Sequence, residues 1–176
     1  RYNSDLGNDL GNLASRTLTM VHKYQDGKVP DPCGATGELK DMVEKAWSPD
    51  LICDAFESYR FSDALATLWS HIGETNQLLT LNRPWELAKS SRPADRLNLS
   101  ATLYYALETL RLSAVLLYPI LPESAELLWR QLGCDEYLGP LRDQRIKDPA
   151  KQGGRTRLEW GQLKPGTRVS KPEIIF

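Results

Sequence analysis

Mostly apolar residues recur at spacings of three and four positions along the first part of the chain, which is the period of one face of an α-helix. The series consists of Leu6, Leu10, Leu13, Thr17, Met20 and Tyr24. Ser4 stands where an N-cap residue belongs, and Asp5 places a negative charge in the first turn, where the helix dipole favours it. The pattern therefore predicts an amphipathic helix over residues 4–24.

A second, polar face follows from the same spacing. At 100° per residue it carries Asn12, Arg16, Thr19 and Lys23. An amide and a guanidinium one turn apart form a pair of fixed donors, which can bind the edge of a nucleic-acid base or a phosphate. The alternative is a solvated face on which Arg16 and Lys23 simply point into water.

Further helical segments follow, separated by clusters of proline and glycine. Residues 25–37 read as a loop, and a short amphipathic piece covers 39–46. Ser48-Pro49 is typical of a helix start, and the apolar face of this helix would run to Tyr59. A long helix is predicted from Ser62 to Asn82, and a short helical start at 84–89.

Residues 94–118 form the most apolar segment, and the apolar positions cover nearly the whole circumference of the predicted helix. A helix of this kind lies at the centre of a fold. It must end before Pro119. Pro122 then starts another helix, which Gly133 closes in the manner of a C′ glycine.

The sum is an all-α fold, an antiparallel bundle of about five helices over residues 1–133. Composition changes after Cys134, and residues 142–157 are charged with little apolar content, which indicates a loop or a disordered stretch. We expect residues 134–176 to form a loop and an extended C-terminal tail that packs back on the bundle.

Composition narrows the possible functions. The 176 residues carry a net charge of -1, so any contact with nucleic acid must come from a local basic patch. The 3 cysteines are scattered and the 2 histidines lie far from them, so we expect no metal site and a reducing, cytoplasmic setting. No apolar run is long enough to span a membrane. The ends of the chain, Arg1 and Phe176, suggest a fragment of a longer protein.

The segment around Trp85 is the second candidate for chemistry, since no catalytic group can be assembled from the sequence. Trp85 follows Pro84 at a helix break, between the cations Arg83 and Lys89. A tryptophan on a turn offers a ring face, and stacking on a base is worth roughly 1–3 kcal/mol. The alternative is a tryptophan that closes the end of the bundle.

Four segments, in order, resemble the anticodon-binding domain of methionyl-tRNA synthetases. Asn8–Arg16 is similar to the opening helix of that domain, and Asn82–Lys89 to its Pro-Trp segment. Tyr118–Pro122 is similar to the joint between its last helices. Trp160-Gly161 and Lys171–Phe176 resemble its C-terminal tail.

This resemblance implies a class I synthetase helical bundle that recognises the CAU anticodon of methionine tRNA. It implies that Trp85 stacks on an anticodon base, on a turn fixed by Pro84, and that Asn12 and Arg16 hydrogen-bond anticodon bases or their backbone. Contacts with the RNA backbone are expected from Lys23, Arg83 and Lys89.

The resemblance also implies a parent enzyme, methionine–tRNA ligase, whose partners include the catalytic domain of the same chain. ATP with Mg, and zinc as a further candidate, would bind in that missing part, so we expect this chain alone to bind no cofactor and to be inactive. His71-Ile72-Gly73-Glu74 resembles the HIGH signature of class I synthetases but lies in a helical pattern. Two alternatives stay open: the equivalent domain of a cysteine, leucine, isoleucine or valine enzyme, and a helical protein-interaction module with no RNA role.

Overall fold

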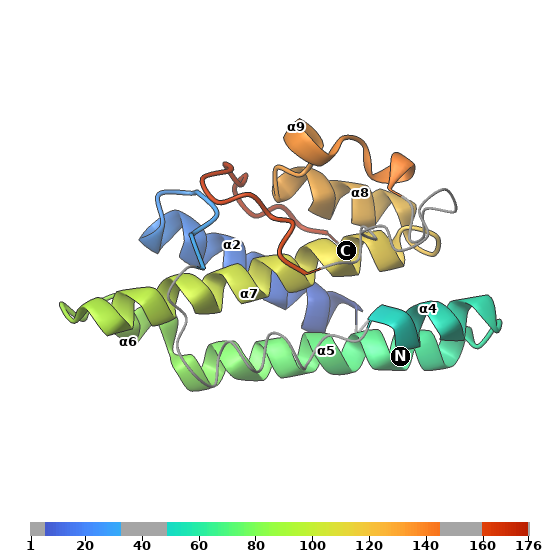
Figure 1. Ribbon diagram of the computed structural model, residues 1–176, viewed down its shortest axis with the longest axis horizontal. Coiled ribbons are helices and arrows are strands. Elements are labelled where there is room, and N and C mark those ends of the chain that lie inside the picture. The colour runs from blue at the N-terminus through green and yellow to red at the C-terminus, as the bar shows by residue number, and fades with distance from the viewer. Residues whose placement is uncertain (1–5, 33–48, 145–159, 176) are drawn as a thin grey trace.

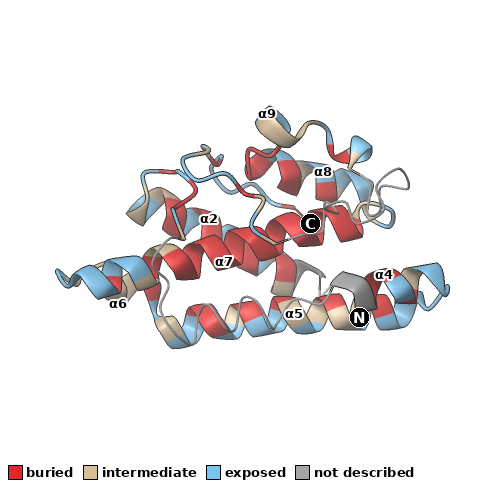
Figure 2. Ribbon diagram, in the orientation of Figure 1, coloured by how far each residue is buried: buried red, intermediate tan, exposed pale blue. Residues whose placement is uncertain are grey.

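Helix α7 (Pro93–Leu117) is the element around which the other helices pack. The computed structural model describes residues 6–32, 49–144 and 160–175. Nearly every residue of α7 from Leu99 onward is buried (Figure 2), as its all-round apolar sequence predicts. Pro93 occupies the first turn, where its missing N–H leaves no bond unmade.

Three longer helices surround α7 (Figure 1). α2 (Asn12–Tyr24) and α5 (Phe61–Asn82) pack against it from the N-terminal half of the chain, and α8 (Pro122–Gln131) packs against it from the other side. α5, α7 and α8 alternate in direction, and α4 (Pro49–Glu57) packs on α5. The described residues form helices and no strand, so the all-α prediction is confirmed.

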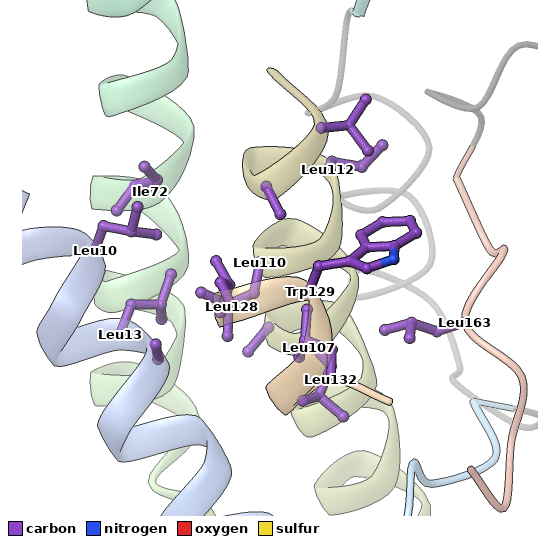
Figure 3. Packing of buried hydrophobic residues seen from close by; sticks show 14 of the residues in the cluster. Leu10, Leu13, Ile72, Leu107, Leu110, Leu112, Leu128, Trp129, Leu132 and Leu163 are labelled. Atoms are coloured by element: carbon purple, nitrogen blue, oxygen red, sulfur yellow. The ribbon is translucent and has the colours of Figure 1, made fainter. Parts of the chain in front are cut away.

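Leucines from each of these helices meet in one core (Figure 3). Leu10 and Leu13 face Ile72 of α5, while leucines of α7 lie between them and Trp129 of α8. Leu163 reaches the same core from the tail. Burying one such side chain contributes roughly 1.5–3 kcal/mol, so the tail shares in the stability of the bundle.

Two expectations for the N-terminal half need correction. The first helix is divided into a π-helix, η1 (Leu6–Gly11), and the α-helix α2. The sequence does not predict this division, because the apolar spacing over six residues is the same for a π-turn and an α-turn. Tyr59 is 82% exposed, since α4 ends at Glu57 and Tyr59 itself adopts a φ of 57°. Ser4 and the amphipathic piece at 39–46 lie outside the described residues.

Short helices also occur where the sequence predicts a loop. α6 (Pro84–Leu87) follows α5 as expected, but α9 (Asp135–Leu138) and the 3-10 turn η2 (Leu141–Asp143) lie beyond Cys134. They are held against α8, because Trp129 donates its Nε1–H to the Gly139 carbonyl at 3.0 Å. Most of the 142–157 stretch lies outside the described residues.

The described part of the tail, residues 160–175, runs along the bundle with turns at 160–161 and 165–166 (Figure 1). Tyr104 donates its hydroxyl to the Leu163 carbonyl at 2.9 Å, and Ser124 donates to the Ile175 carbonyl at 3.0 Å. Val169 is buried between these two points. The tail therefore contacts the middle of α7 and the start of α8.

A buried ion pair holds the beginning of this tail. Glu108 and Arg111 of α7 have fully buried side chains, and Arg111 Nη2 donates to Glu108 Oε1 at 2.7 Å. The same carboxylate accepts the backbone N–H groups of Gly161, Gln162 and Leu163 at 2.8, 2.9 and 3.2 Å. Burial alone would lower the pKa of Arg111, but the Glu108 carboxylate outweighs it and raises that pKa, so the guanidinium stays charged.

Candidate nucleic-acid interface

The polar face of α2 is the first part of the interface. Asn12 and Lys23 are exposed and Arg16 is half-buried, while Leu13 and Thr17 on the opposite face lie in the core. Helical geometry places Asn12 and Arg16 on neighbouring turns of one rigid element. Among the described residues, neither side chain has a hydrogen bond or ion pair. Both donors are therefore available to a ligand.

The junction between α5 and α6 is the second part. Arg83 ends α5 in the left-handed region, with φ 45° and ψ 65°, and Pro84 opens α6. A non-glycine residue held there costs of order 1–3 kcal/mol, so the surrounding structure must impose it. The Arg83 carbonyl accepts the N–H groups of Glu86 and Leu87 at 2.8 and 3.2 Å, and these bonds fix the sharp reversal of the chain.

This reversal presents Trp85. The indole is partly buried and packs against the core, and its remaining surface is open to solvent. Trp85 therefore takes part in the packing of the bundle and also keeps some surface that a ligand can reach. Among the cations beside it, the Arg83 side chain has no partner within the described residues, and Lys89 pairs with exposed Glu86 at 3.1 Å. An exposed pair of this kind is weak, so Lys89 can exchange it for a phosphate.

A hydrogen bond joins α5 to the π-helix η1, directly before α2. Asn76 of α5 donates its side-chain amide to the Asp9 carbonyl at 3.2 Å, just before α2 begins. From this meeting point the two helices diverge toward Tyr24 and Asn82 (Figure 1). Asn12 and Arg16 lie on α2 beyond that point, and Trp85 follows α5 at its far end.

The diverging ends of these helices both contact the same turn of α7. Gln25, directly after α2, donates to Ser100 at 3.3 Å, and Asn82 donates to Thr102 at 2.9 Å. At 1.5 Å per residue, Arg16 lies about 13 Å before Gln25. Lys23, Arg83 and Trp85 therefore lie toward this end of the bundle, whereas Asn12, the first residue of α2, lies about 20 Å before Gln25. No hydrogen bond joins the α2 group to the α6 group among the described residues.

The residues that build this arrangement are not among those predicted from the sequence. Asn76 occupies a position of the apolar series of α5, and a polar residue there is a signal that its side chain needs a partner. Asn82 stands at the helix end that the proline predicts. Nothing in the sequence indicates the left-handed conformation of Arg83, because arginine has no preference for it.

The segment that resembles a catalytic signature lies in a regular helix. His71-Ile72-Gly73-Glu74 lies inside α5, as its pattern predicts, and burial lowers the pKa of His71 against the opposing effect of Glu74. The ranges 6–32, 49–144 and 160–175 hold no cluster of three metal-ligating side chains. None of the helices described is both long and apolar enough to cross a membrane.

Sequence comparisons with known proteins identify relatives of this chain. No protein-family model matches the sequence. The methionine–tRNA ligase of Streptomyces coelicolor is 34% identical over 180 residues, which covers 100% of this chain and 32% of the relative. The ligase of Bacillus subtilis is 37% identical over 178 residues, covering 100% of this chain and 24% of the relative. The chain thus spans about a third or less of the curated relatives it matches.

Solved structures give the same result. Methionyl-tRNA synthetase of Mycobacterium tuberculosis bound by methionyl-adenylate superposes with a TM-score of 0.76 at 30% identity, over 100% of this chain and 32% of that one. The helical fold and these matches relate the chain to the aminoacyl-tRNA synthetases. Along its whole length, the chain is related to a segment of the methionyl-tRNA synthetases, and the resemblance expected from the four motifs is confirmed.

Proposed function

We propose that this chain is the anticodon-binding domain of a methionyl-tRNA synthetase and that it recognises the CAU anticodon of methionine tRNA. The observation that supports the proposal is the donor pair Asn12 and Arg16, without a hydrogen bond or ion pair among the described residues, together with the partly buried Trp85 on the turn after α5. Single-stranded RNA is recognised by stacking of splayed bases together with hydrogen bonds to their edges. These three residues supply both interactions.

Each residue has a distinct role in this proposal. Trp85 stacks on an anticodon base, on the turn that Arg83 and Pro84 hold. Asn12 and Arg16 donate hydrogen bonds to base edges or to the backbone. The surrounding cations contact phosphates, which position the RNA but do not read its sequence; they are Lys23, Arg83 and Lys89.

The chemistry belongs to the remainder of the parent protein. The relatives are named methionine–tRNA ligases, and one neighbour was solved with methionyl-adenylate, the product of methionine and ATP. We infer that the parent enzyme attaches methionine to tRNA with ATP and Mg in the cytoplasm, and that zinc, if used, binds there too. The catalytic part of the same chain and tRNA are then the partners of this domain.

A competition experiment tests the proposal. Binding of a stem-loop RNA with a CAU anticodon is compared with binding of loops in which each anticodon base is changed. Trp85→Ala should weaken CAU binding by roughly 1–3 kcal/mol, about 5- to 150-fold, and reduce the preference for CAU. Arg16→Ala should weaken it by a similar amount, since hydrogen bonds to charged groups are worth about 1.5–3 kcal/mol. Arg142→Ala is the control, because Arg142 is exposed and lies beyond α8.

Three outcomes contradict the proposal. Unchanged CAU binding in Trp85→Ala and in Arg16→Ala would show that these residues do not form the binding site. Tighter binding of another anticodon would indicate the equivalent domain of a cysteine, leucine, isoleucine or valine enzyme. Absence of any salt-sensitive RNA affinity would favour a helical protein-interaction module, because phosphate contacts make RNA binding fall with salt.

A further inference from the structure

Two cations face each other where the tail crosses the loop after α2. Lys28 and Arg168 form an isolated antiparallel bridge. Val29 donates its N–H to the Thr167 carbonyl at 2.8 Å, and Val169 donates to the Gly27 carbonyl at 2.9 Å. These bonds flank the bridge, so Lys28 and Arg168 are its non-hydrogen-bonded pair. In such pairs the Cα atoms lie about 4.5 Å apart and the side chains share one face.

This arrangement is electrostatically unfavourable for the domain alone. Like charges directly opposite each other destabilise a bridge. Both side chains are exposed, and neither has an ion pair within the described residues. Exposed Asp26 is the acidic residue in the adjacent turn, so it offsets one charge at most. An anionic ligand would turn this repulsion into attraction.

Two further cations extend the pair into a patch. Lys23 lies in the last turn of α2, on the polar face that carries Asn12 and Arg16, and Lys164 lies in the tail four residues before Arg168. Both are exposed and have no ion pair among the described residues. Two segments far apart in sequence, residues 23–28 and the tail, therefore bring positive charge to the C-terminal end of α2.

We propose that Lys28 and Arg168 form a phosphate-binding site for the RNA strand beside the anticodon loop, with Lys23 linking this site to the α2 face. The proposal rests on the proposed function and adds a second contact surface to it. A run of backbone phosphates offers negative charge to two exposed cationic side chains on one face of the bridge, which have no ion pair among the described residues. Because Arg168 comes from the tail, the site is complete only when the tail is docked.

Salt dependence of RNA binding tests the site. The double variant Lys28→Ser with Arg168→Ser should bind the CAU stem-loop roughly tenfold more weakly at low salt. Its slope of log affinity against log salt should be shallower by about 1.4, since each phosphate contact on a single strand contributes about 0.7. The preference for CAU over other anticodons should be unchanged, because phosphate contacts carry no sequence information.

A matched control separates the site from the general loss of charge. Arg142→Ser with Lys171→Ser also removes two exposed cations without an ion pair among the described residues. It should leave affinity and slope unchanged. Equal effects of both double variants, or no effect of the first, would overturn the phosphate site. If Trp85→Ala and Arg16→Ala still abolish the CAU preference, only this inference fails and the proposed function stands.

Discussion

Two arginines of this domain sit in opposite environments. Arg111 on α7 is fully buried and donates to Glu108, whose carboxylate also binds three backbone N–H groups of the tail. Arg16 on α2 is half-buried, and its side chain has no partner among the described residues. Both lie on helices that contact each other, so helix position alone does not decide the difference.

The difference shows how the domain divides its polar residues. A buried charge must be paired, because an unpaired charge in the interior is strongly destabilising. Arg111 is therefore committed to the fold. Arg16 keeps enough contact with water to stay unpaired at little cost, so it remains available to an anionic or polar ligand. Mutations should separate these two uses clearly.

Glu108→Ala should produce the largest change in stability. It leaves the Arg111 guanidinium buried without a counter-charge and removes the acceptor of three tail N–H groups. Breaking a buried pair in this way costs about 3–5 kcal/mol in the free energy of unfolding. Urea denaturation followed by circular dichroism measures the loss. Glu126→Ala, at an exposed position of α8, is the control and should stay within about 0.5 kcal/mol.

Gly133→Ala should have an intermediate effect on the same tail. Gly133 has a φ of +70°, and an added Cβ would lie 2.3 Å from the Arg168 carbonyl oxygen. The left-handed backbone alone costs about 1–2 kcal/mol for alanine, and displacement of the tail adds to this. Gly166→Ala is the matched control, because Gly166 has a φ of +85° with nothing within 4 Å of the added carbon. Thermal melts should rank Gly133→Ala below Gly166→Ala, and equal melting temperatures would contradict the contact.

Arg16→Ala should change stability least. With no partner to lose, its free energy of unfolding should stay within about 0.5 kcal/mol of the unmodified chain. The variant that weakens RNA binding would thus leave the fold intact, the reverse of Glu108→Ala. A loss of more than about 1 kcal/mol in the same urea titration would show that Arg16 serves the fold after all.

The pattern of the sequence predicts those parts of the fold that depend on local signals. α7, α8 and α6 begin at prolines and end at breaks that are visible in the chain, and the all-round apolar sequence of α7 places it at the centre. The π-turns of η1 and the early end of α4 leave no such mark, because neither a proline nor a glycine stands at Leu6 or at Tyr59, whose φ is 57°.

The candidate site also has parts that the sequence predicts and parts that only the structure shows. Asn12, Arg16 and Trp85 stand out in the sequence because their types and spacing suit RNA. The pairing of Glu108 with residues 161–163, and of Lys28 with Arg168, joins positions more than fifty residues apart. No periodicity links such positions, so only the folded chain brings them together.

The docking of the tail has a consequence for biosynthesis. Leu163, Val169 and Ile175 complete a core whose other buried members lie between Leu10 and Leu141. On the ribosome, the helices are therefore made well before the segment that completes their packing and donates its N–H groups to the buried Glu108 carboxylate. Until the last of these residues leaves the exit tunnel, part of the interior of the nascent domain stays exposed to water.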